Sequence, residues 1–211
     1  MNTVGIYRNY GALWSYDYRR GDPTLPHAEL SEGRCTDVYW NSDIVLSDPA
    51  IAASLAARLA TRLKAWDAVS SVEWVIGSAY GAITWSYELA RQLGARHGFT
   101  KKDPADPQRQ VWDGRIPAGA SVLQCEDVIT SFRTIFEVRR AVGATNPDAV
   151  RFLEPVAAIV WRPVALDAAE VEVIALTVQA ANAWPQESCL LCRQGSPRLR
   201  PKAHWGDLIG E

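Results

Sequence analysis

The 211-residue chain has no apolar run long enough to span a bilayer, and its first residues lack the apolar segment of a signal peptide. It also lacks a marked excess of either charge, because 22 Lys and Arg against 24 Asp and Glu leave a formal net charge of −2. That balance gives no electrostatic reason to expect nucleic-acid binding. These absences predict a cytoplasmic protein with no membrane or nucleic-acid partner. The length and the 48% hydrophobic content suit one folded domain with a full core.

Residues that commonly bind transition metals are few, with four cysteines and three histidines in the whole chain. Cys189 and Cys192 have the spacing Cys-Leu-Leu-Cys, which is typical of half a zinc site or of a redox pair. Two cysteines do not complete a tetrahedral zinc site, and no second pair of ligands at similar spacing is present in the sequence. The interpretation we favour is therefore reduced structural thiols, with a metal as the alternative.

Strand and helix signals alternate along the chain. Residues 49–65 begin with proline in the first turn and carry apolar residues at helical spacing, which predicts a helix. A short apolar strand is expected at 72–76, followed by a loop of small residues at 77–81. The next helix is expected at 83–93 and should end at Gly94.

The second half of the chain continues this alternation. Residues 103–119 contain three prolines and two glycines without periodicity, which predicts a long exposed loop. Strands are expected at 97–100 and 121–129, and a helix should follow from 134 to Gly143. Further strand signals occur at 150–164, and residues 167–184 suggest a helix and a strand in an undecided order.

This order predicts an α/β fold with a mostly parallel central sheet and helices on both faces. Ligands of such sheets bind beyond the C-terminal ends of the strands. Two segments, 77–82 and 126–134, are expected at such ends. Together they form the candidate site.

The second of these segments combines two acids with three hydroxyl side chains. Glu126 and Asp127 follow a buried strand, where unpaired carboxylates are costly and need water, a cation or hydroxyl partners. Thr130, Ser131 and Thr134 stand at the start of a helix, whose first N–H groups attract phosphate. The pattern indicates a sugar phosphate, with the acids binding ribose hydroxyls or magnesium. In the alternative interpretation the acids are a solvated strand end and Thr130 is the helix N-cap.

The stretch VLQCEDVITSFRT, residues 122–134, resembles the phosphoribosyl pyrophosphate (PRPP) motif of the type I phosphoribosyltransferases. Further segments, in the same order along the chain, resemble orotate phosphoribosyltransferases. They are the N-terminal hood (GALWSYDY and ELSEGRCTDVYWNSDIVLSDP), the pyrophosphate loop (VIGSAYGAITWSYELARQLG), the start of the catalytic loop (FTKKD) and the tail CLLCRQGSPRLRPKAHW. The resemblance implies the type I phosphoribosyltransferase fold, divided into a hood at 1–48, a PRPP-binding core at 49–180 and a tail at 181–211.

The resemblance also implies a role for each matching residue. Glu126 and Asp127 would contact the ribose hydroxyls, and Asp127 would handle a proton or stabilise the ribosyl cation while holding Mg²⁺ indirectly. Lys102 would neutralise the departing pyrophosphate, and Arg109 would add a cation in trans if the chain is a homodimer, as family members are. Three groups complete the set: Thr130, Ser131, Arg133 and Thr134 for the 5′-phosphate; Gly77, Ser78, Ala79, Tyr80 and Gly81 for pyrophosphate; Tyr39, Trp40 and Arg162 for the base.

The sequence departs from the family pattern at its ligand sites. Phe132 stands where glycine is usual, and glycine allows close approach of the backbone or a positive φ. The other departures are Glu32 and Cys35 in the hood, Tyr80 and Trp85 by the pyrophosphate loop, and Ala105 and Pro107 in the catalytic loop.

Two hypotheses about function follow from the resemblance and its departures. The first is a Mg²⁺-dependent enzyme that transfers ribose 5-phosphate from PRPP to orotate, or to another pyrimidine-like base, and releases pyrophosphate. The second is a non-catalytic relative that binds PRPP or a nucleotide for regulation. We favour the transferase because both acids, Lys102 and Arg162 are kept.

Overall fold

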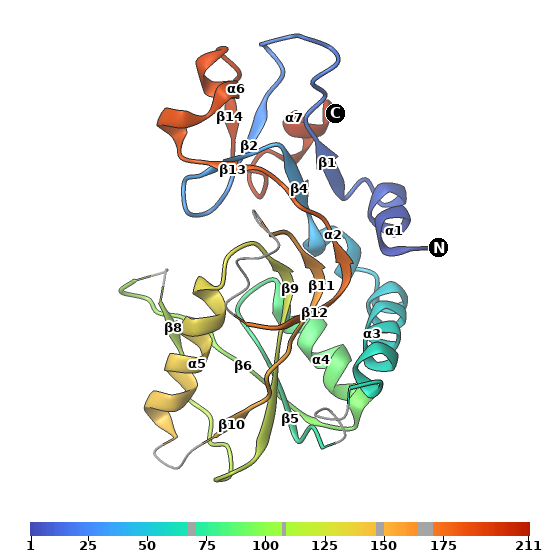
Figure 1. The fold of residues 1–211 in the computed structure, drawn as a ribbon, viewed down its shortest axis with the longest axis vertical. Helices are drawn as coiled ribbons and strands as arrows, with labels where there is room; N and C mark the ends of the chain where they lie inside the picture. The colour runs from blue at the N-terminus through green and yellow to red at the C-terminus, as the bar shows by residue number, and fades with distance from the viewer. Residues whose placement is uncertain (67–70, 107–108, 147–149, 164–170) are drawn as a thin grey trace. The chain divides into compact units, whose positions relative to one another are not determined.

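The computed structural model describes residues 1–66, 71–106, 109–146, 150–163 and 171–211. The chain forms two compact units (Figure 1). Leu46–Gln179 is the core unit. Met1–Val45 and Ala180–Glu211 together make the second, which we call the terminal unit because it joins both ends of the chain.

The core unit is built on a parallel sheet. Each neighbouring pair of strands runs parallel, and β10 (Arg151–Phe152) adds to β9 in the same direction. The main strand order is β12 (Val173–Val178), β11 (Val156–Trp161), β9 (Ser121–Ile129), β5 (Trp74–Gly77) and β6 (Arg96–Phe99). The central strands β9 and β11 are almost continuously buried, as expected for strands covered on both faces. The predicted fold class is thereby confirmed.

Helix α5 covers one side of this sheet, and helices α3 and α4 cover the other (Figure 1). Helix α3 (Pro49–Lys64) begins where the Asp48 carboxylate accepts a hydrogen bond from the backbone N–H of Ala50 at 2.9 Å. Helix α4 (Ala82–Leu93) ends at Gly94, whose φ of 68° is the left-handed value that favours glycine. Both helices lie where the sequence predicts them.

Helix α5 (Arg133–Thr145) runs past Gly143, where the sequence predicts its end. The helix continues because a carbonyl of its last turn, that of Val142, accepts hydrogen bonds from Asn146. The Asn146 side chain donates to the Val142 carbonyl at 2.7 Å, and the Asn146 backbone N–H donates to the same carbonyl. The end of this helix is therefore set by an asparagine and not by the glycine.

Residues 103–119 are not simply the exposed loop that their prolines and glycines suggest. Strand β7 (Lys101–Lys102) pairs antiparallel with β8 (Gln110–Val111), and Trp112 and Ile116 are buried against the α5 face of the sheet. The Trp112 ring fits there because residue 98 is glycine. A Cβ at that position would come within 2.3 Å of the ring. Pro107 lies outside the described residues.

The last sequence segment of undecided order is described from residue 171 onward. Its described part forms strand β12 and the short strand β13 (Ala183–Trp184). Residues 167–170, where a helix was the alternative, lie outside the described part of the chain.

The terminal unit contains a small sheet made from both ends of the chain. Its strand order is β13, β3 (Cys35–Thr36), β2 (His27–Glu29) and β14 (Arg198–Leu199). A separate ribbon pairs β1 (Leu13–Ser15) with β4 (Val38–Trp40). The helical elements are α1 (Thr3–Asn9), α2 (Ser42–Leu46, at the boundary with the core unit), η2 (Gln186–Ser188), α6 (Leu190–Arg193) and α7 (Trp205–Ile209). The tail is thus held to the N-terminal segment by main-chain pairing.

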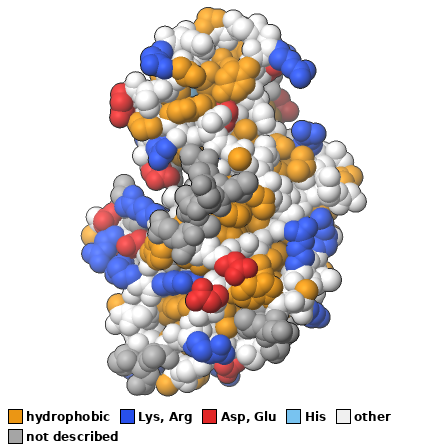
Figure 2. Space-filling model, viewed as in Figure 1, with side chains coloured by type: hydrophobic (Ala, Val, Ile, Leu, Met, Phe, Trp, Pro, Cys, Tyr) orange, Lys and Arg blue, Asp and Glu red, His pale blue; other side chains and the backbone are white. Residues whose placement is uncertain are grey.

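On the face shown in Figure 2, Lys and Arg side chains are scattered among acidic, polar and hydrophobic ones. This mixture agrees with the formal net charge of −2. Among the described residues, no helix has the length and apolar character needed to cross a membrane.

Candidate functional site

The two segments proposed for the site meet at one edge of the core sheet. Strands β5 and β9 are parallel neighbours, so the residues that follow them emerge at the same edge. The Ser78 hydroxyl donates a hydrogen bond to Glu126 Oε2 at 2.6 Å. A Cβ built on Gly81 would lie 2.9 Å from Asp127 Oδ2, so only glycine lets the loop approach this carboxylate so closely.

Glu126 is the most perturbed acid of the site. Its side chain is 4% exposed, and among the described residues its Oε1 has no hydrogen-bond partner. Burial raises the pKa of Glu126 to about 8, and the charge of Asp127 adds to the rise, while the Ser78 hydrogen bond and Lys102 oppose it. The Gln124 side chain also opposes the rise, but burial dominates, so the Glu126 carboxyl is expected to be largely protonated at neutral pH.

The 77–81 loop is compact because its residues other than Tyr80 are small. A Cβ on Gly77 would lie 2.6 Å from Ser86 Oγ and 2.8 Å from the Ala82 carbonyl oxygen. Two bulky residues occur in this region. Trp85 is fully buried within the core unit and Tyr80 is 74% exposed, so neither ring fills the loop. The Ala79–Tyr80 peptide bond is cis.

Phe132, the most serious departure from the family pattern, is turned into the core. Its ring packs against an apolar cluster that includes Ile129, Ile135 and Val156. Its φ is −82°, an ordinary value for any residue, so this position does not require glycine here. Phe132 is also the N-cap of α5 and offers no side-chain cap, so Thr130 is not the N-cap proposed in the alternative interpretation.

The helix start therefore has the features of an anion site. Thr130 and Thr134 are partly exposed, and Ser131 and Arg133 are exposed. Its N-cap Phe132 makes no side-chain hydrogen bond to the first turn of this 13-residue helix, whose leading N–H groups have no acceptor within the helix itself.

The two proposed cations occupy different surroundings. Lys102 on β7 is partly buried, and its charge acts on Glu126, which places it near the acid pair. Arg109 is exposed beside β8, and it acts on Glu137 of α5, where it adds to the larger effect of Arg140 in lowering the pKa of that acid. The structure thus brings Lys102, but not Arg109, to the acids of the same chain.

The residues proposed for the base belong to both units. Arg162 follows β11 in the core unit and is 4% exposed, with its backbone N–H donating to the Ile129 carbonyl. Tyr39 and Trp40 lie on β4 of the terminal unit. Trp40 is 3% exposed and packs edge-on against Tyr7, with ring centroids 4.7 Å apart, so its ring is part of the interior of that unit.

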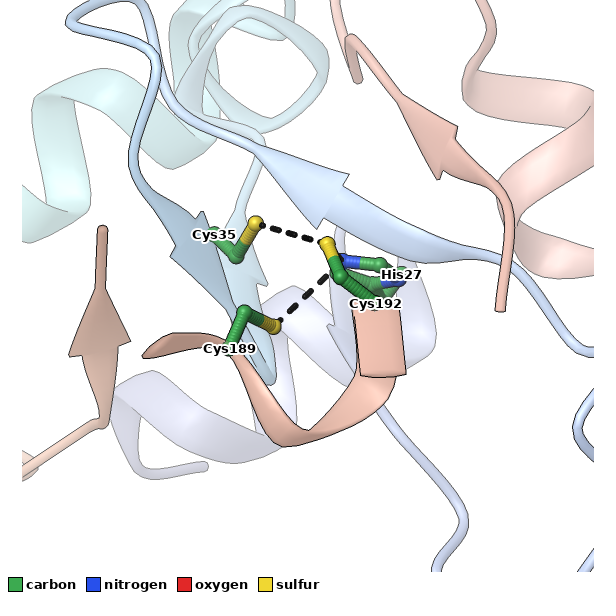
Figure 3. A group of neighbouring side chains, drawn as sticks. All are labelled: His27, Cys35, Cys189 and Cys192. Atoms are coloured by element: carbon green, nitrogen blue, oxygen red, sulfur yellow. Dashed lines mark hydrogen bonds between the residues drawn. The ribbon is translucent and has the colours of Figure 1, made fainter. Parts of the chain in front are cut away.

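A second group of reactive side chains lies in the terminal unit (Figure 3). The ligand atoms of His27, Cys35, Cys189 and Cys192 all lie within 4.8 Å of one another. The sequence offers no second pair of ligands at similar spacing, which favours reduced structural thiols at Cys189 and Cys192, but the fold brings a second pair to them. His27 and Cys35 supply that pair from neighbouring strands. Their separation in the sequence matches no common ligand spacing, which is why sequence reasoning missed them.

Comparison with models of known protein families gives no match. Comparison with curated proteins gives relatives over almost the whole chain. The orotate phosphoribosyltransferase of Heliobacterium modesticaldum is 31% identical over 202 residues, which cover 94% of this chain and 95% of the relative. The enzyme of the same name from Desulforamulus reducens is 31% identical over 198 residues, with 94% of each chain covered.

Solved structures agree on the fold. The crystal structure of orotate phosphoribosyltransferase from Aeropyrum pernix has a TM-score of 0.57 at 21% identity, covering 83% of this chain and 93% of that one. A crystal structure of adenine phosphoribosyltransferase has a TM-score of 0.53 at 13% identity, covering 66% and 88%. At these identities the likeness shows the type I phosphoribosyltransferase fold alone.

Proposed function

The chain belongs to the orotate phosphoribosyltransferase family, and we propose that it transfers ribose 5-phosphate from PRPP to orotate with release of pyrophosphate. The observation that carries the proposal is the meeting of the acid pair with the 77–81 loop, through the Ser78–Glu126 hydrogen bond and the close approach of Gly81 to Asp127. A purely regulatory, non-catalytic role is not favoured, because relatives matched along nearly the whole chain are named as transferases.

The acid pair is proposed to bind the ribose ring. At neutral pH the largely protonated Glu126 can both donate to and accept from a ribose hydroxyl, and its unpartnered Oε1 supports this role. The adjacent Asp127 carboxylate is proposed to accept from a second hydroxyl and to stabilise the positive charge that develops on the ribose as pyrophosphate leaves.

The start of α5 is proposed to bind the 5′-phosphate. The N–H groups of its first turn and the hydroxyls of Thr130, Ser131 and Thr134 would donate to phosphate oxygens. The guanidinium of Arg133 would add a charge-assisted contact. The packing of Phe132 into the apolar cluster supports this arrangement, because the ring is held by the core while the helix start stays exposed.

The donor set at the acid pair fits Mg²⁺, which prefers oxygen ligands and keeps several of its waters. We propose that Asp127 holds the ion through water, beside the unpartnered oxygen of Glu126. When bound, the ion would neutralise charge on the pyrophosphate group.

Backbone and cationic groups are proposed to hold the leaving group. The small residues of the 77–81 loop would let main-chain N–H groups approach the pyrophosphate oxygens. Lys102 would stabilise the charge that builds on them, and its action on Glu126 supports a place near the ribose. Arg109, exposed beside β8, is proposed to act on the site of a partner subunit in a homodimer.

Tyr39 and Arg162 are proposed to contact the base, with the Arg162 guanidinium binding the orotate carboxylate. Trp40 is proposed to support Tyr39 from within the terminal unit, since its own ring is almost fully buried. An arginine suits the first role because its planar donors match a carboxylate in two parallel hydrogen bonds.

The test is the Mg²⁺- and PRPP-dependent loss of orotate absorbance. Asp127→Asn should lower kcat by about 10²-fold or more, because it removes a charge that acts on the transition state. Glu88→Gln is the matched control, since this acid on α4 is not one of the proposed site residues and forms an ion pair with Arg91 at 2.9 Å. Unchanged turnover in Asp127→Asn, or no turnover of orotate by the wild-type protein, would contradict the proposal.

A further inference from the structure

We propose that His27, Cys35, Cys189 and Cys192 form a structural zinc site in the terminal unit. Their side chains point toward one another from three segments (Figure 3). His27 lies on β2 and Cys35 on β3. Cys189 is the N-cap of α6, and Cys192 lies within that helix. Three sulfurs and one imidazole nitrogen fill the four positions of a structural zinc and leave none open for catalysis.

All four ligand atoms lie within 4.8 Å of one another, and three of their six separations are close to those of a tetrahedron around zinc. Bond lengths of about 2.3 Å to sulfur and about 2.0–2.1 Å to nitrogen place two sulfurs about 3.8 Å apart, and a sulfur and a nitrogen about 3.6 Å apart. The Sγ atoms of Cys35 and Cys192 are 3.6 Å apart. His27 Nε2 lies 3.7 Å from Cys189 Sγ and 3.4 Å from Cys192 Sγ.

Distances of this size also suit packed thiols, so the orientation of the imidazole is the stronger argument. His27 Nδ1 lies 2.8 Å from the Ser196 hydroxyl, and that hydroxyl donates its proton to the Leu25 carbonyl at 2.6 Å. Ser196 has one proton, so it must accept from His27 Nδ1–H. The proton of the neutral ring is therefore on Nδ1, and the lone pair of Nε2 faces the sulfurs.

This hydrogen bond is the kind that orients a metal-binding histidine. Zinc ligands commonly donate their second ring N–H to an oxygen, which fixes the tautomer and the plane of the ring. His27 is fully buried, and the hydrogen bond to Ser196 holds the neutral tautomer that binds zinc.

The surroundings also suit the charge of such a site. Cys35 is fully buried, so a thiolate there requires a nearby positive charge such as a metal ion. Zinc with three thiolates carries a net charge of −1, and Arg198 lies close enough to Cys35 and Cys192 to offset it. Arg198 is itself held by an ion pair with Glu29 at 2.8 Å.

A zinc ion at this point would fasten the C-terminal tail to the N-terminal segment, since the ligands come from opposite ends of the chain. The small sheet of the terminal unit has strands of only two or three residues, which provide little stability of their own. Metal binding would add free energy to the folded state because the site does not exist in the unfolded chain. The inference is independent of the proposed transferase activity.

The first test measures metal in the wild-type protein, purified under reducing conditions without added chelator. We expect about one zinc ion per chain by elemental mass spectrometry. The protein loaded with Co²⁺ should show the thiolate-to-cobalt charge transfer and the intense visible bands of a tetrahedral site. Cys35→Ala and Cys189→Ala should lose the metal, whereas Cys125→Ala, which removes a buried thiol of β9 in the core unit, should keep it.

The second test avoids variants that fail to fold. Ser196→Ala keeps all four ligands and removes only the partner of His27 Nδ1, so it should weaken zinc binding about 10- to 100-fold in competition with a chromophoric chelator. An unchanged affinity would contradict the assigned tautomer. Wild-type protein that holds no zinc, takes up none and shows no change in Tm on zinc addition would overturn the proposal. So would a Cys35–Cys192 disulfide in metal-free protein as isolated, because it would identify a redox pair.

Discussion

Replacing Glu126 by glutamine is expected to change how stability depends on pH. Burial raises the pKa of Glu126 from 4.5 to about 8, a rise of about 3.5. One pKa unit corresponds to about 1.36 kcal/mol, so the ionised acid lowers the free energy of unfolding by about 5 kcal/mol relative to its protonated form. Because the folded state binds the proton more tightly, this loss develops as pH rises from 4.5 through 8.

Glutamine removes the titration while keeping a carbonyl oxygen that can accept from Ser78. The free energy of unfolding of Glu126→Gln, relative to wild type, should therefore rise by about 4 kcal/mol from pH 5 to pH 9, the part of the titration inside that window. Ionisable groups that do not interact with Glu126 contribute equally to both proteins and cancel in the difference.

The assay is urea denaturation of both proteins without ligand at several pH values, followed by tryptophan fluorescence. The nine tryptophans of the chain provide a strong signal. Glu88→Gln serves as the control and should not show this rise with pH, because it removes an ion pair with the exposed Arg91 and leaves Glu126 in place. Parallel stability curves for wild type and Glu126→Gln would refute the assignment of a buried, proton-binding Glu126.

Three further substitutions test the rest of the site. Phe132→Gly should lower the free energy of unfolding by about 1–3 kcal/mol through lost packing. Its PRPP affinity, measured by calorimetry, should stay within a few-fold of wild type. A large loss of affinity would show that the ring shapes the phosphate site. Gly81→Ala places a Cβ 2.9 Å from Asp127 Oδ2 and should lower kcat by about 10²-fold at an unchanged circular dichroism spectrum; full activity would mean that the loop moves freely. Lys102→Ala should lower kcat by about 10²-fold or more. It should also raise the pKa of Glu126 further, since the lysine charge opposes that rise. An unchanged titration of Glu126 would contradict the place of Lys102 near the acid pair.

Local sequence was sufficient for the elements that position the transferase site. The apolar run before Glu126, the helix after the 77–81 loop and its end at Gly94 each follow from residue types within a few positions. Parallel order then put the two loops at one edge of the sheet, so their meeting was predictable in outline.

Contacts between distant segments overruled local signals at other positions. Residues 103–119 have the composition of an exposed loop, but Trp112 is buried because Gly98, on another strand, leaves room for its ring. Likewise, Phe132 looked incompatible with a phosphate loop, and only its packing against Ile129 and Ile135 shows where the ring goes.

Short patterns in consecutive residues were enough to predict the α/β order, the acid pair and the family. Only the tertiary structure brought His27 and Cys35 to Cys189 and Cys192. No spacing rule links the first pair of ligands to the second, since the pairing of β2 with β3 and β14 sets their separation in space. Strand pairing over such distances is decided by the fold as a whole, which no short stretch of sequence contains.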